Sequence, residues 1–172
     1  MKLIEAMKKV KDLTKKAEDL RGKIATYHAD LDIETPPYGD RQKEQVSEWL
    51  QAHGDVVQEI ENLQVAVQRT NLATSVTIEL GKNKVTKTIA AWIHRRRTLA
   101  ALDLAAWSGM NDRGLREGTV PSTIPGAEAR KVSIRRHYDP RIRDERKEIY
   151  RSEPSIIDGT LEVVNATTEL IG

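Results

Sequence analysis

The chain has 172 residues and a mass of 19.4 kDa, which fits a single domain or a single domain with an extended arm. Charged residues make up 31% of it, but 28 basic residues nearly balance 26 acidic ones, and the net charge of +2 predicts no strong general attraction to nucleic acid. The absence of cysteine excludes disulfides, thiolate metal centres and cysteine nucleophiles, and the low aromatic content, 4% with no phenylalanine, argues against a thick globular core.

Residues 1–71 predict a helical hairpin arm. Apolar residues dominate both seam positions of a heptad repeat over 3–29 and again from about 42 to 71. Thr35-Pro36-Pro37 cannot continue a helix, because proline lacks the backbone donor. A short connection between two such helices favours an antiparallel pair. The seam residues are Leu3, Ala6, Val10, Leu13, Ala17, Leu20, Ile24 and Tyr27, then Val46, Trp49, His53, Val56, Ile60, Leu63, Val67 and Thr70.

The hydrophobic period changes after the second heptad segment. Apolar and polar residues alternate from 76 to 80 ahead of a turn at Gly81-Lys82-Asn83-Lys84, which predicts a β-hairpin over 72–87. Thr88 is suited to cap a third helix over 88–109. The apolar stripe of that helix is broad, so we expect it to pack against more than one neighbour. The stripe consists of Ile89, Trp92, Ile93, Leu99, Leu102 and Ala106.

The C-terminal part begins with a long loop over 110–130 that contains glycine, proline, serine and threonine. A loop of this length in a small domain is usually functional, disordered or ordered against a partner. Residues 131–172 then predict a strand over 131–138, a final helix opened by Asp139 and Pro140, and a polar tail. Pro154 and Gly159 interrupt that helix, so we expect a kink or break near 152–155.

Together these elements predict a mainly α protein with a single domain over 1–172. A long antiparallel, coiled-coil-like helical hairpin is joined by two further helices and a small β-hairpin or strand element.

Four short motifs stand out along the chain: Met1-Lys2-Leu3-Ile4-Glu5-Ala6, Gln68-Arg69-Thr70-Asn71-Leu72-Ala73-Thr74, Arg96-Arg97-Thr98-Leu99 and Asn165-Ala166-Thr167-Thr168-Glu169-Leu170. In order and spacing they resemble the septicolysin-like proteins, a family of small helical bacterial and phage-borne proteins without an established activity. The resemblance spans most of the chain, and it implies long antiparallel helices, a short β-element and a final helix with a polar tail. The chain departs from the family in its long 110–130 linker, in Pro154 and Gly159, and in Ala166, where the family tends to have tryptophan.

The chain carries few signals of catalysis. Its histidines, His28, His53, His94 and His137, lie far apart and show no metal-ligand spacing. The carboxylates of 144–148 alternate with basic residues, which is typical of solvated salt bridges on a helix. No serine has the context of a nucleophile elbow, and Gly81-Lys82-Asn83-Lys84 lacks the spacing of a phosphate-binding loop. We therefore expect no enzyme, no catalytic residues, no cofactor and no metal.

Basic residues cluster at 94–97 and between 130 and 151, and they leave two alternatives open. The first is contact with a nucleic-acid backbone, because arginine and lysine release counterions from phosphates. The second is a set of ion pairs between helices or subunits, which the acidic neighbours and the scarcity of stacking aromatic residues favour. The candidate nucleic-acid contacts are Arg95, Arg96, Arg97, Arg135, Arg136, Arg141 and Arg143.

A thin hairpin buries little of its own seam, so part of the apolar surface should meet another helix or another chain. We expect a non-enzymatic structural protein that forms a homo-oligomer, joins other assembly proteins, or does both. The family resemblance suggests a capsid or tail component of a phage or prophage, and it leaves a membrane-acting lytic protein as a weaker alternative. The candidate interface residues are Trp49, His53, Val56, Ile60, Trp92, Trp107, Ile142, Ile149, Leu170 and Ile171.

The sequence also bears on where the protein acts. Residues 1–10 are charged and amphipathic, no apolar signal-peptide core follows them, and no apolar run approaches the roughly 20 residues of a membrane-spanning helix. We expect a protein of the cytoplasm or the virion that is not secreted through a signal peptide and has no membrane span.

Overall fold

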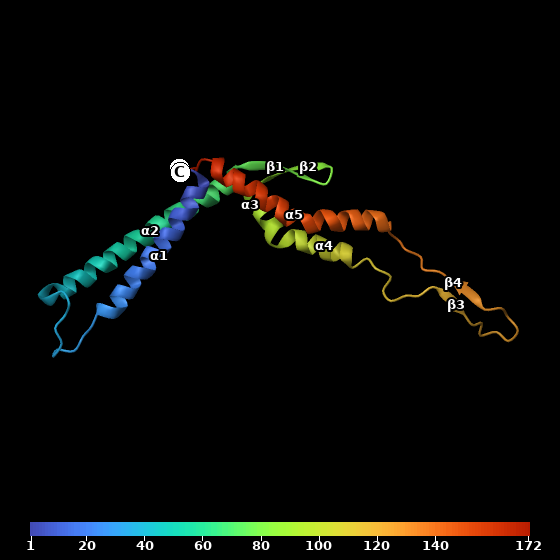
Figure 1. Ribbon diagram of the computed structural model, residues 1–172, viewed down its shortest axis with the longest axis horizontal. Helices are drawn as coiled ribbons and strands as arrows, with labels where there is room; N and C mark the ends of the chain where they lie inside the picture. Colours follow the sequence, from blue (N-terminus) through green and yellow to red (C-terminus); the bar gives the residue numbers. More distant parts are fainter. The chain divides into compact units, whose positions relative to one another are not determined.

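The computed structural model describes all 172 residues, and its mainly helical architecture confirms the predicted fold class (Figure 1). The long helices are α1 (Leu3–Tyr27), α2 (Gln42–Ala73) and α5 (Pro140–Thr167), and the short ones are α3 (Ile89–His94) and α4 (Ala100–Ser108). A 3₁₀ turn at Gly39–Arg41 precedes α2, and a π-helical turn at Arg95–Leu99 joins α3 to α4. Two antiparallel two-stranded sheets pair β1 (Ser75–Leu80) with β2 (Asn83–Thr88) and β3 (Gly118–Val120) with β4 (Arg130–Val132).

The chain divides into two compact units. The first comprises Met1–Val76, Lys87–Ala90 and Thr160–Gly172, and the second comprises Thr77–Thr86 and Ala91–Gly159.

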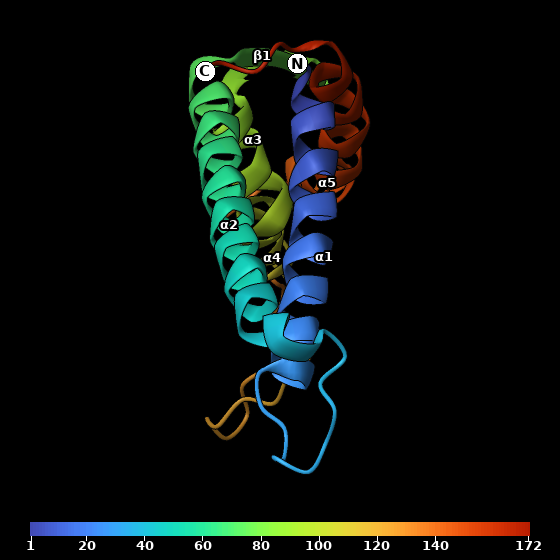
Figure 2. The same cartoon turned by 90° about the vertical axis from the view of Figure 1, so that its left-hand side faces the viewer.

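The first unit is built on the predicted antiparallel pair of α1 and α2, which lie side by side (Figure 2). Leu20, Trp49 and Val56 form its buried centre. Every predicted seam residue except Tyr27 is buried or half-buried, because a heptad repeat keeps one face of each helix turned to its neighbour. The half-buried residues packed around the centre are Leu13, Ala17, Ile24, Val46, Ala52 and Ile60.

Aromatic rings and one glutamine fasten the loop that joins α1 to α2. The ring of Trp49 lies 5.8 Å from that of Tyr27 and meets that of Tyr38 edge-on at 5.6 Å. The Gln42 amide donates to the Tyr27 carbonyl at 2.9 Å, and its oxygen accepts from the Tyr38 N–H at 3.1 Å. Both ends of the loop are therefore held to the hairpin.

The C-terminal tail crosses the opposite end of the hairpin (Figure 2). The Leu3 N–H donates to the Thr168 carbonyl at 2.9 Å, and the Ile171 N–H donates to the Thr70 hydroxyl at 2.9 Å. Lys2 Nζ lies 2.5 Å from a carboxylate oxygen of Glu169. The polar tail therefore pairs with residues of its own chain.

In the second unit, the β1–β2 hairpin turns at Gly81 with a φ of +62°. Two-residue hairpin loops favour glycine at such a position, since a side chain is strained there. A Cβ atom at Gly81 would also lie only 3.0 Å from Ile149 Cδ1, so the turn packs closely on α5. The Thr77 and Thr86 hydroxyls bond across the strands at 2.7 Å.

Three elements of this unit differ in detail from the sequence-based expectation. The third helix is divided by the π-helical turn, in which the Ala100 N–H donates to the Arg95 carbonyl. The strand expected over 131–138 is shorter and pairs as β4, Arg130–Val132. Helix α5 continues through Pro154 without the break that was one of the two expected outcomes, and the buried residues on either side, Glu153 and Ile157, anchor it to the unit. A kink at Pro154 stays a prediction. Asp139 caps α5 as predicted, accepting from the Arg141 N–H at 2.8 Å.

Residues 111–137, which we call the extension, leave α4 and return to α5 with β3 and β4 near the tip (Figure 1). Gly118 pairs with Val132 and Val120 pairs with Arg130. Every residue from 113 to 131 is exposed. The sequence predicted a loop over 110–130 and missed this sheet, because strands of three residues carry almost no periodic signal.

We expect the substitution Leu20→Ala to lower the free energy of unfolding by about 2 to 5 kcal/mol, since it leaves a cavity in the seam. Met7→Ala, on the exposed part of the same helix, is the matched control and should change it by no more than about 0.5 kcal/mol. Urea denaturation measures both values. Equal losses in the two variants would mean that the seam does not stabilise the hairpin.

Candidate functional site

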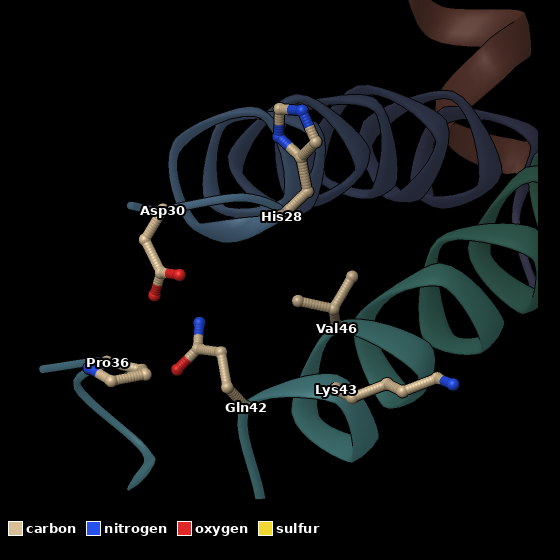
Figure 3. Close-up of a pocket in the computed structure, with 6 residues that line it drawn as sticks. All are labelled: His28, Asp30, Pro36, Gln42, Lys43 and Val46. Atoms are coloured by element: carbon tan, nitrogen blue, oxygen red, sulfur yellow. The ribbon is translucent and has the colours of Figure 1, made fainter. Parts of the chain in front are cut away.

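Several open hollows of the structure lie at loops. One of about 450 Å³ lies beside the loop between α1 and α2, where the Asp30 carboxylate and the Gln42 amide face the same space and Lys43 points away (Figure 3). No group of three or more histidine, aspartate or glutamate side chains is arranged to hold a metal ion. This hollow is lined by His28, Asp30, Pro36, Gln42, Lys43 and Val46.

A second hollow, of about 410 Å³, lies at the base of the extension. Its wall contains a two-pronged ion pair, in which Arg136 Nε and Nη2 donate to the two Asp112 carboxylate oxygens at 2.8 and 2.7 Å. Arg143 donates to the Met110 carbonyl at 3.0 Å, and its guanidinium lies 5.5 Å from the centre of the Tyr138 ring. These contacts join the two ends of the extension, so both arginines serve to fasten it.

A partly buried polar cluster centres on Arg95. Its Nε and Nη2 donate to the two carboxylate oxygens of Glu153, both at 2.7 Å, and its Nη1 donates to Asp103 at 2.6 Å. Glu153 is only 1% exposed, and its hydrogen bonds raise the pKa of Arg95 well above the ordinary value, with Asp103 adding to the effect. Arg95 also lies 5.7 Å from the centre of the Tyr150 ring. The cluster ties the π-helical turn to α5 and commits three of the five N–H donors of Arg95 to carboxylates.

The remaining candidate arginines divide into paired and unpaired ones. Arg96 contacts Asp158 at 2.6 Å, and Arg143 contacts Asp144 at 2.9 Å. Arg97 and Arg135 are exposed and form no ion pair, and Arg141 has only a distant contact with Asp139, at 3.9 Å. Four of the seven candidates, Arg95, Arg96, Arg136 and Arg143, therefore already have carboxylate partners in the chain. Contact with nucleic acid stays a prediction that relies on the other three.

The candidate interface residues fall into buried and exposed groups. Trp49, Val56 and Trp92 are buried, and half-buried positions are held by His53, Ile60, Trp107, Ile149 and Leu170. Ile142 and Ile171 are exposed. On α5, Ile142, Ile156 and Val163, which are spaced fourteen and seven residues apart, are all exposed.

The structure also reveals apolar faces that the sequence analysis did not single out. On α2, Leu50, Val57, Val65 and Leu72 are exposed and form a second stripe, apart from the seam. Around α4, Leu99 and Leu102 are exposed with Ala101, Ala105 and Ala106 between or beside them. The sequence contains a sign of the α4 face, because Asp103 is the only charged residue from 98 to 111. In the structure Asp103 bonds to Arg95.

Comparison of the chain with protein-family models, with curated proteins and with solved structures finds no match. The resemblance to the septicolysin-like family therefore stays a prediction.

We expect Arg95→Met to destabilise the protein by about 3 to 5 kcal/mol, because it leaves Glu153 buried without its counter-charge. Arg96→Met is the matched control. It removes an exposed pair with Asp158 and should cost no more than about 1 kcal/mol. The double variant Arg95→Met/Glu153→Met should recover much of the loss, since apolar side chains can replace a buried pair. Urea denaturation tests the three variants, and equal effects of the two single changes would contradict a structural role for the Arg95 cluster.

The hydrogen bonds from Arg136 lower the pKa of Asp112 below its ordinary value. Because this pKa is lower in the folded protein, the pair contributes stability above the unfolded pKa of about 3.9, and that contribution is lost as the pH falls through the folded value. We expect Arg136→Gln to raise the pKa of Asp112 towards 3.9. Carboxyl-carbon NMR titration measures the shift, and an unchanged titration curve would show that the pair does not form in solution.

Proposed function

We propose that the protein is a non-enzymatic structural component that works as a homo-oligomer. The observation that carries this proposal is the apolar surface left exposed on α2, α4 and α5. Leu50, Leu102 and Val163 are 55%, 65% and 64% exposed, one on each helix. Exposed apolar rows along helices are typical of surfaces that meet another protein, since a helix that is apolar all round is normally buried.

The α4 face is suited to close packing between copies. It combines the two exposed leucines, Leu99 and Leu102, with alanines that let another helix approach, and the one charged residue from 98 to 111, Asp103, is held in an ion pair with Arg95. Core regions of protein interfaces are depleted of charged residues in the same way. We place this assembly in a phage or prophage virion on the strength of the family resemblance alone. A gene located among virion-assembly genes would support that setting, and a gene among metabolic genes would contradict it.

No helix of the structure is long and apolar enough to span a membrane.

We expect the protein to scatter light as an oligomer at micromolar concentration, and we expect Leu102→Lys to shift it towards monomer, because the change places a charge in the α4 face. Thr14→Lys adds the same charge at an exposed position of α1 and should leave the oligomer unchanged. Size-exclusion chromatography with light scattering measures the mass, and circular dichroism checks that both variants fold. A stable monomer at every concentration would overturn the proposed function.

A further inference from the structure

The extension cannot be stable on the strength of its own contacts. Its sheet has two strands of three residues, and an isolated two-stranded hairpin is only marginally stable in water. Three large apolar side chains of this segment, Leu115, Val120 and Ile124, are all exposed. The structure therefore presents a sheet and apolar side chains without a covering surface.

The extension also has a distinct charge. Between 113 and 135 it carries five basic residues, Arg113, Arg116, Arg130, Lys131 and Arg135, against the two acidic residues Glu117 and Glu128. None of these five basic side chains forms an ion pair in the structure. A surface that covers the extension should therefore be acidic and partly apolar.

The loop between α1 and α2 has this complementary character. Residues 30–40, which we call the acidic loop, contain four carboxylates and no basic residue. Leu31 and Ile33 alternate with the carboxylates and are 63% and 86% exposed. Asp30 borders the hollow shown in Figure 3, and together with Glu34 it borders another of about 350 Å³. The loop thus offers acidic groups, apolar side chains and hollows together.

We propose that the extension of one copy docks on the acidic loop of a second copy, an inference that rests on the proposed homo-oligomer. Basic side chains would meet the carboxylates, and Leu115, Val120 and Ile124 would cover Leu31 and Ile33. A phosphate backbone would match the basic charge but would leave the apolar side chains exposed, so the acidic loop is the better partner. The contact joins two different surfaces, so it is heterologous, and repetition produces a closed ring or an open filament.

A charge exchange between the two surfaces tests the proposal. The variants Arg116→Glu/Arg130→Glu and Asp30→Lys/Asp32→Lys should each raise the concentration needed for half-assembly by about tenfold or more, because like charges would face each other. The chain with all four changes should assemble nearly as well as the original, which excludes misfolding as the cause. Lys15→Glu/Lys16→Glu, on the exposed face of α1, makes the same charge change as the first variant and should have no effect.

Sedimentation velocity measures assembly, and chemical cross-linking of mixed light and heavy isotope-labelled chains identifies the contact. We expect cross-links between 30–40 of one copy and 113–135 of another. If the charge-exchange variants assemble like the original chain, the docking proposal is overturned and the proposed function stands. If the original chain never assembles, both are overturned. Cross-links found only within single copies would also overturn the docking. The same holds if the arginine variants assemble normally but no longer bind a DNA oligonucleotide that the original chain binds.

Discussion

The contact between α1 and α2 is the constraint on which the rest of the first unit depends. A single seam, with Leu20, Trp49 and Val56 at its centre, holds two helices of 25 and 32 residues together. Each helix buries one face and leaves the others to solvent, because no third helix runs along the length of the pair in this unit. In a hairpin of this kind, each helix makes its backbone hydrogen bonds internally, so the pair folds with only a modest burial of apolar surface. Its outward faces are consequently free to carry charges, as on α1, or a second apolar stripe, as on α2.

Where apolar burial is small, ion pairs between residues distant in the sequence define the arrangement. Lys2 with Glu169, Arg95 with Glu153 and Asp112 with Arg136 each join two segments that are separated by 24 to 167 positions. Exposed pairs of this kind add little stability. The buried Arg95 cluster is different, because its two-pronged geometry fixes both the direction and the register of the contact. We interpret it as the element that selects one arrangement of the π-helical turn against α5, rather than as a large source of stability.

The sequence predicted the features that depend on neighbours along the chain. The heptads located the seam of α1 and α2, the prolines located the loop, and Asp139 with Pro140 located the start of α5. The features it missed depend on partners far away in the chain. No residue close to Arg95 in the sequence indicates that Glu153 lies opposite its side chain. Likewise, no residue close to Thr168 indicates that its carbonyl accepts a hydrogen bond from Leu3. The continuity of α5 through Pro154 also depends on distant partners. Burial of the residues on both sides of the proline outweighs the local tendency of proline to break a helix.

The candidate surfaces were only partly predictable, because overall composition hides how charge is distributed. A net charge of +2 indicates a chain with little electrostatic preference, yet residues 30–40 carry four carboxylates without a basic residue, and residues 113–135 carry five basic residues against two acidic ones. Oppositely charged surfaces of this kind would attract each other in the proposed docking, while a net charge near zero keeps the long-range repulsion between whole molecules small. The same balance that argues against a general affinity for nucleic acid therefore favours association of the chain with itself. Because the two surfaces differ, such association has a direction, which a symmetric apolar contact through α4 alone would lack.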